Sequence, residues 1–254
     1  MNIVVCIKQV PDVDDIKWTK ENNLDRSQML SKINLYDDWA LNCAIKIKNQ
    51  FKNVNLTAIS MGPMQALEVL QYALAKGATR AILLSDKFFS ASDTLITADV
   101  LARAIKKFVP DFDIIITGQM AQDGDTAQVP VSLAQKLDIV DLIYTQKIIN
   151  ADKNTVSVNQ KIENKINVLE TKTPCLIAIN DKQEGCTPKI EDYIRAQNKQ
   201  IEIYGAEDLN LSKEQTGLTA SPTMVYRAYR PKSEREAELI NENIVDKLSE
   251  FLKG

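Results

Sequence analysis

Short apolar runs alternate with longer amphipathic segments through the first 140 residues of the chain. The runs have the length of strands, whereas the segments between them carry apolar residues at helical spacing. Strands are predicted at residues 2–10, 54–60, 80–84 and 114–116, and helices at 36–48, 65–76, 94–108 and from Val129 onward. Strand–helix units in this order predict an α/β fold with a parallel sheet and right-handed crossovers.

The pattern changes after residue 140. Four short strands are predicted at residues 142–149, 155–162, 166–170 and 176–179, with a hairpin turn at Asp152-Lys153-Asn154. An exposed polar arm ending in a short helix (181–200), an irregular segment (205–231) and an amphipathic terminal helix (234–252) follow. We therefore expect an α/β domain with a hairpin extension and the arm over 1–200. A C-terminal extension over 201–254 would pack on this domain or on a partner.

The overall composition narrows the classes of function. The 254 residues carry a net charge of −3, which argues against a nucleic-acid binder because such proteins need a basic stripe. No apolar stretch is long enough to span a bilayer. The chain starts at once with the strand-like MNIVVCIKQV rather than with a signal peptide. We expect a cytoplasmic protein without nucleic-acid or membrane partners.

Residue types that do catalysis are scarce. The chain has no histidine, which removes Ser-His and Cys-His pairs and most zinc or haem sites. Its four cysteines form no CxxC pair, and Cys6, Cys43 and Cys175 lie in apolar patterns where free cysteine usually fills the core. We therefore expect no catalytic residue and no metal site. Chemistry carried by a bound cofactor fits this inventory best.

The most informative segment is IIITGQMAQDGDTAQV at residues 114–129, where a buried strand runs through a polar loop into a helix. Ligands of open α/β sheets lie beyond the carboxyl ends of the strands, and amides at a helix start favour phosphate. The segment contains neither a GxGxxG fingerprint nor a P-loop. A plain turn capped by Asp and Thr has the same composition, so the residues alone leave a nucleotide loop and an ordinary turn both open.

Several segments together resemble the β subunits of electron transfer flavoproteins. They are VVCIKQVPD (4–12), SKINLYDDWAL (31–41), AISMGP (58–63), SDTLITA (92–98), TGQMAQDGDTAQV (117–129) and GLTASPTMV (217–225). The resemblance covers nearly the whole chain in order, and the DGDTAQV run is specific. It implies a flavodoxin-like or adenine-nucleotide-hydrolase-like fold. It also implies a heterodimer with an α subunit that has its own FAD.

The resemblance further implies which residues bind a nucleotide. These are Cys6, Asn34, Leu35, Tyr36, Asp37, Met61, Gln119, Asp123, Gly124, Asp125, Thr126, Ala127, Gln128 and Val129. Amides near Ala127 should face phosphate, and Gly124 should let the loop turn close to the ligand. Asn34 and Gln128 suit adenine or ribose edges. Asp123 and Asp125 would repel phosphate, so we expect them to cap the loop or to accept from ribose. We expect Lys8 on the solvated surface.

Members of this family divide by the nucleotide in the β site. One type holds AMP as a structural filler, and the other holds a second FAD and performs flavin-based electron bifurcation. The segments SDTLITA and DGDTAQV resemble the second type and add Asp93, Thr94 and Thr97, at a helix start, to the expected site. Simple N-capping would explain Asp93 or Thr94 but does not explain why Thr97 is a threonine. FAD is therefore expected, with AMP as the alternative.

The resemblance also implies the electron partners. Electrons would come from NADH or from a flavin dehydrogenase such as an acyl-CoA dehydrogenase. They would pass to the α-subunit FAD and, in the bifurcating type, to ferredoxin. The polar arm carries one apolar residue, Ile190, amid Lys189, Glu191 and Asp192, and a single apolar anchor in a polar ring is typical of a small docking site. The arm departs from the usual family sequence at Gly185-Cys186, which leaves the dehydrogenase open.

Overall fold

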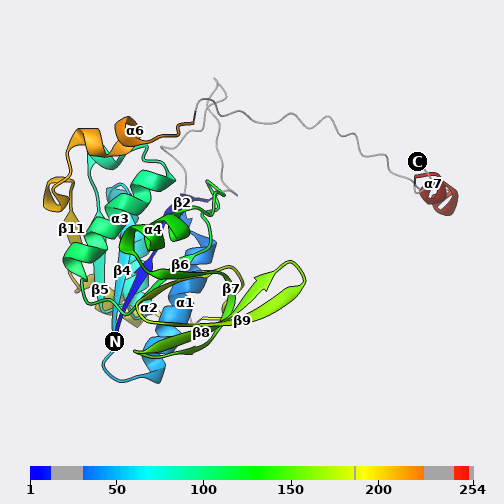
Figure 1. Ribbon diagram of the computed structural model, residues 1–254, viewed down its shortest axis with the longest axis horizontal. Coiled ribbons are helices and arrows are strands. Elements are labelled where there is room, and N and C mark those ends of the chain that lie inside the picture. Colours follow the sequence, from blue (N-terminus) through cyan, green and yellow to red (C-terminus); the bar gives the residue numbers. More distant parts are fainter. Residues whose placement is uncertain (13–30, 186, 226–242, 252–254) are drawn as a thin grey trace.

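The computed structural model describes residues 1–12, 31–185, 187–225 and 243–251 (Figure 1). Within them, a nine-stranded sheet has the order β11-β5-β4-β1-β6-β10-β7-β8-β9. Its strands are β1 (Asn2–Cys6), β4 (Asn55–Met61), β5 (Arg80–Leu84), β6 (Ile114–Gly118), β7 (Val140–Ala151), β8 (Thr155–Ile162), β9 (Lys165–Lys172), β10 (Cys175–Ile179) and β11 (Glu202–Tyr204). A separate antiparallel pair consists of β2 (Gln9–Pro11) and β3 (Ser31–Ile33).

The strands from β11 to β7 run parallel, and β8 and β9 continue the sheet antiparallel. The residues of β6 and β10 are buried at every position, as expected for parallel strands that are covered by helices on both faces. The outer strand β9 is largely exposed, and Figure 1 shows the β8–β9 hairpin extending away from the body of the domain. The predicted parallel α/β sheet is thus confirmed.

Helices cover both faces of the sheet. One buried cluster joins α1 (Leu35–Gln50) and α2 (Leu67–Lys76) to one face, and a second joins α3 (Thr94–Phe108) and α4 (Val129–Leu137) to the other (Figure 1). The short helix α5 (Ile190–Gln197) packs against α2. Further along lie the 3₁₀ turns η4 (Glu207–Leu209) and η5 (Lys213–Gln215) and the helices α6 (Gly217–Ala220) and α7 (Ile244–Phe251).

Several boundaries agree with the sequence. The strands at 80–84 and 155–162 and the helix at 94–108 have the predicted limits. The Asp93 side chain caps α3 by accepting from the Ile96 amide. Gly77 ends α2 with φ +126°, a conformation that side chains disfavour. Cys6, Cys43 and Cys175 are buried, whereas Cys186 and positions 234–242 of the predicted terminal helix lie outside the described residues.

Two predictions about strands were incomplete. The single strand predicted over 2–10 ends at Cys6, because the Lys8 amide donates to the Asp37 carboxylate instead of to a neighbouring strand. Gln9 to Pro11 then pair with β3. The strand β11 was not predicted, since three residues are too few to show a period. None of the helices in the described ranges is long and apolar enough to cross a membrane.

Candidate functional site

The carboxyl ends of three adjacent strands meet where the chain changes direction across the sheet. The chain builds outward from β1 through β4 to β5 and then returns to the other side of β1 with β6. Such a switch point leaves a crevice beyond the strand ends, where ligands of open α/β sheets bind. Cys6, Met61 and Gly118 are the last residues of these strands. The structure therefore gathers the expected nucleotide segments at one edge.

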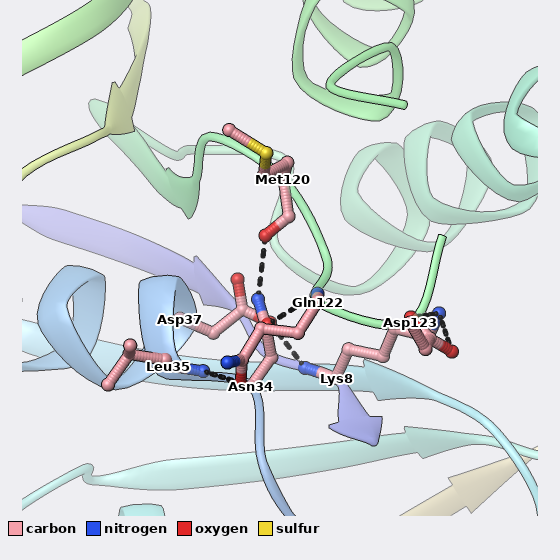
Figure 2. A network of polar contacts seen from close by, with 7 residues as sticks. All are labelled: Lys8, Asn34, Leu35, Asp37, Met120, Gln122 and Asp123. Atoms are coloured by element: carbon pink, nitrogen blue, oxygen red, sulfur yellow. Dashed lines mark hydrogen bonds and ion pairs between the residues drawn. The ribbon is translucent and has the colours of Figure 1, made fainter. Parts of the chain in front are cut away.

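Asn34 connects the start of α1 to the loop that follows β6 (Figure 2). Its side chain is almost completely buried, with 1% exposure. The Nδ2 atom donates to the Met120 carbonyl oxygen at 2.8 Å, and the Oδ1 atom accepts from the Gln122 amide at 3.0 Å. The Leu35 amide donates to Gln122 Oε1 at 3.3 Å. The polar atoms of Asn34 are therefore bonded to the protein's own loop in this structure.

Asp37, one turn further along α1, joins the ends of β1 and β6. Its Oδ2 atom accepts from the Lys8 amide at 2.8 Å, and its Oδ1 atom accepts from the Gly118 amide at 3.1 Å. Burial raises the pKa of Asp37 from 3.8 to about 7, although hydrogen bonds from Lys8, Asn34 and Gly118 oppose the rise. The carboxyl group accordingly acts as an internal acceptor that holds two strand ends together.

Gly118 makes this close approach possible and was missed as a site residue. A Cβ at this position would lie 2.6 Å from Tyr36 Cβ and 2.7 Å from the Tyr36 carbonyl carbon. Any larger residue would push the first turn of α1 away from β6. The available signal was a glycine at the end of an apolar strand, which often marks a close backbone approach.

The loop from 119 to 128, which we call the nucleotide loop, turns at two unexpected residues. Asp125 and Ala127 have φ values of 48° and 53°, in the left-handed region that non-glycine residues rarely adopt. A Cβ at Gly124 would meet nothing within 4 Å, so no protein contact requires the glycine. Strained conformations of this kind cluster at ligand sites, where the surrounding structure holds them.

Lys8 lies beside this loop and makes an ion pair that the sequence did not indicate. Its Nζ atom contacts both carboxylate oxygens of Asp123, at 2.7 and 2.8 Å (Figure 2). The two side chains keep 46% and 33% of their exposure, so the pair contributes at most about 1 kcal/mol. It ties the end of β1 to the nucleotide loop.

The start of α4 is open. No side chain caps it, and the N-cap residue is Gln128. Within the described residues, the amides of Thr126, Ala127 and Gln128 donate to no protein acceptor. Unpaired amides at a helix start carry a partial positive charge and suit an anion. This feature fits the phosphate of a nucleotide.

The N-terminus of α3 is capped by the side chain of Asp93. Asp93 caps Ile96 and also accepts from the Thr223 amide at 3.1 Å and the Thr223 hydroxyl at 2.8 Å. The Asp93 amide donates to the Ser221 hydroxyl at 2.9 Å. These bonds fasten the segment after α6 to the start of α3. Asp93 thus has structural partners that the sequence did not reveal.

The structure brings the two helix starts together. Thr94 Oγ1 donates to Gln128 Oε1 at 2.9 Å, which links the first residue of α3 to the N-cap of α4. Thr97 lies one turn further along α3 and is half-buried. The two segments that suggested the larger nucleotide are therefore neighbours.

The other expected residues have mixed surroundings. Burial, together with the nearby Asp37 charge, raises the pKa of the Cys6 thiol to about 12, so the thiol stays protonated. Gln119 is 1% exposed, and its Oε1 atom accepts from the Tyr144 amide at 2.7 Å. Tyr36 and Met61 are half-buried. The described residues contain no group of His, Cys, Asp and Glu that could hold a metal ion.

Ile190 is separate from this edge. It begins α5, which packs against α2, and it is 79% exposed. Ile194, one turn along, is 56% exposed, so the two side chains form a small apolar stripe. The arm therefore presents apolar surface, in keeping with the docking role expected of it.

Comparison with known proteins gives consistent matches. A model described as the electron transfer flavoprotein domain matches residues 23–208. The electron transfer flavoprotein subunit beta of Thermoanaerobacterium thermosaccharolyticum is 39% identical, over 100% of this chain and 97% of the relative. Protein FixA of Azorhizobium caulinodans is 38% identical over 93% and 86%. The caffeyl-CoA reductase-Etf complex subunit CarD of Acetobacterium woodii is 37% identical over 98% and 95%.

Proposed function

The chain belongs to the electron transfer flavoprotein family as a β subunit, and from this premise we propose that it binds FAD beyond the carboxyl ends of β1, β4 and β6. A bound flavin supplies the redox chemistry, and the protein supplies binding and orientation. In this proposal NADH or a dehydrogenase provides electrons, which are divided between the α-subunit FAD and ferredoxin. The complex acts in the cytoplasm.

The hydrogen bond between Thr94 and Gln128 is the observation that carries the FAD proposal. It places the first turns of α3 and α4 side by side at the site. AMP has one phosphate, which one helix start can hold. A diphosphate with a ribityl chain extends further, and in this proposal that extension runs past the first turn of α3, which carries Thr94 and Thr97.

Each part of the nucleotide loop has a role in this proposal. The amides of residues 126–128 hold phosphate, because they donate to no acceptor among the described residues and lie next to the positive end of the α4 dipole. Lys8 offsets the negative charge of Asp123 next to that phosphate. Gly118 lets the first turn of α1 pack close to the end of β6, where the site is proposed.

One observation favours the alternative, a conventional β subunit that holds AMP. Asp93 already caps α3 with its carboxylate, and a carboxylate at this position repels a second phosphate. Of α3 and α4, only α4 then has a start that no side chain caps. A single phosphate on α4 would satisfy that arrangement.

The decisive experiment is cofactor analysis of the purified αβ complex. The bound nucleotides are extracted, separated and counted per heterodimer. We expect two FAD. One FAD together with one AMP would remove the bifurcation proposal and leave the conventional carrier. A complex in which the β chain holds no nucleotide would contradict both versions of the site.

The partners in this proposal are an α subunit and a dehydrogenase. The name of CarD places that relative in a complex with caffeyl-CoA reductase, which supports an enzyme acting on a CoA ester as the class of partner. Exposed Ile190 is the proposed docking anchor. We expect Ile190→Ala to slow electron transfer with the dehydrogenase about tenfold while flavin content stays unchanged. Ile203→Ala, at a 45% exposed position on β11, is the matched control and should have no effect. Unaltered dehydrogenase turnover in Ile190→Ala would remove the docking role.

A further inference from the structure

We propose that Asn34 and Asp37 are positioning residues, which fix the nucleotide loop in its binding conformation before a ligand arrives and do not themselves contact the ligand. This inference rests on the proposed nucleotide site and deepens it. It changes the role that the family resemblance implied for both side chains.

The hydrogen bonds of Asn34 and Asp37 are directed to the nucleotide loop and to the ends of the strands. Asn34 bonds the Met120 carbonyl and the Gln122 amide, and Asp37 bonds the Lys8 and Gly118 amides. These four partners are backbone groups, and the Asn34 side chain also hydrogen-bonds to Asp37. Only one orientation of the Asn34 amide satisfies both of its backbone partners, because a carbonyl must meet the NH₂ group and an amide must meet the oxygen.

Both side chains are also buried. Asn34 and Asp37 are 1% and 7% exposed, and Figure 2 shows them between the first turn of α1 and the nucleotide loop. A ligand atom could reach the Asn34 amide only by displacing the loop that the amide holds. The adenine or ribose edge is therefore contacted by loop residues, and Asn34 acts through them.

Without the hydrogen bonds from Asn34 and Asp37, the nucleotide loop would have little to hold its conformation. Inside the first half of the loop, the Gly124 and Asp125 amides donate to the Ala121 carbonyl, at 3.2 and 2.8 Å. Asp125 and Ala127 hold left-handed conformations that an unsupported chain would leave. A loop that is ordered in advance binds more tightly, because binding no longer carries the cost of ordering it.

The chain offers a matched control on the same helix. Asn42 is also on α1, is 5% exposed, and donates through Nδ2 to the Gln183 carbonyl at 3.0 Å. Its partner belongs to the polar arm and not to the nucleotide loop. Asn34→Ser and Asn42→Ser therefore remove the same kind of buried amide. The first releases the nucleotide loop, and the second releases the polar arm.

The experiment uses the αβ complex after dialysis has removed the nucleotide from the β site. Hydrogen exchange of the peptide covering 118–128 is measured without ligand, and affinity is then measured with AMP and with FAD. We expect Asn34→Ser to speed hydrogen exchange of the loop in the ligand-free complex. The same variant should lower the affinity for the nucleotide at least about tenfold. Asn42→Ser should raise exchange near residue 183 and leave nucleotide affinity unchanged. Asp37→Asn should follow Asn34→Ser, with faster exchange at Gly118.

Each outcome decides between the two roles. Weaker binding with unchanged loop exchange would mean that Asn34 contacts the ligand directly, which overturns the inference. Unchanged binding and exchange would overturn it as well. Should Asn34→Ser fail to assemble, Asn34→Asp keeps an acceptor for the Gln122 amide, loses the donor to Met120 and places a second carboxyl group beside Asp37, and the same criteria apply. A wild-type complex that binds neither AMP nor FAD would overturn the proposed function together with this inference. Tight binding of AMP alone would overturn only the choice of FAD.

Discussion

The first turns of α1 and α3 each present an aspartate to backbone amides, but the two carboxylates lie in opposite surroundings. Asp37 is buried between the ends of β1 and β6, and burial raises its pKa to about 7. Asp93 lies near the surface. Its partial burial favours the neutral form, yet hydrogen bonds from Ile96 and Thr223 outweigh this and hold the pKa of Asp93 below its ordinary value.

The difference shows how the proposed phosphate site can have acidic residues close by. Asp37 is directed inward, where it holds strand ends together, and Asp93 closes its own helix and fastens the segment around Thr223. Neither carboxylate is free to face the ligand. Among the described helices at this edge, α4 has neither an acidic cap nor an acid in its first turn, whereas α1 carries Asp37 and Asp38 there. We therefore propose that the phosphate binds at the start of α4.

The largest effect that tests this comparison is the pH dependence of stability. A raised folded pKa means that the folded state holds a proton that the unfolded chain releases. The contribution of Asp37 is therefore fully present below pH 3.8 and is lost as the pH rises through about 7. A difference of about 3 between the two pKa values corresponds to about 4 kcal/mol. Asp93 has the opposite sign, because its lowered pKa gives stability that disappears only as the pH falls below about 4.

Unfolding of the αβ complex, followed from pH 3 to 8, checks both signs. Relative to wild type, Asp37→Asn should show a curve that no longer loses stability between pH 4 and pH 7. Asp93→Asn, which keeps a side-chain cap, should change the curve only at the acid end. Equal slopes for wild type and Asp37→Asn would mean that Asp37 is ionised like a surface carboxylate.

Features that depend on neighbouring residues could be predicted from the sequence, whereas features that depend on distant residues could not. The order of strands and helices and the loop after β6 follow from local pattern, because apolar runs, glycines and caps are properties of neighbouring residues. The strain at Asp125 and Ala127 is not local in this sense, since nothing in the residue types indicates a left-handed backbone at Ala127.

The role of Asn34 shows the same limit at the site. A polar residue just before a helix has the same pattern whether its side chain contacts a ligand, caps the helix or holds a distant loop. Its partners, Met120 and Gln122, are more than 80 positions away, and only the folded sheet brings them next to α1. The bonds between Asp93 and Ser221 and between Thr223 and Asp93 join residues that are even farther apart, at 128 and 130 positions.

The second prediction gives α4 an acid like that of α3. Gln128→Asp would place a negative charge beside the amides of residues 126–128 at the start of α4. The new charge would repel phosphate. We expect nucleotide affinity to fall about 100-fold, measured by titrating AMP and FAD into the αβ complex. Gln128→Asn supplies a neutral side chain of the same length as the control and should cost much less affinity. Equal losses in both variants would show that the bond to Thr94, and not the open helix start, matters for binding.

The smallest effect concerns the hydroxyls on α3, and it distinguishes the two nucleotides. Thr94→Val together with Thr97→Val removes both hydroxyls with little change of volume, and leaves the Asp93 cap in place. If FAD extends past α3, its affinity should fall about 30-fold, since each of the two lost hydrogen bonds costs about 1 kcal/mol at a partly exposed position. AMP, held at α4, should bind with unchanged affinity. Thr94→Ser with Thr97→Ser keeps the hydroxyls and should bind both nucleotides as the wild type does. An equal loss for AMP and FAD in the valine variant would mean that Thr94 acts only by holding Gln128, and that the first turn of α3, like that of α1, supports the site without touching the ligand.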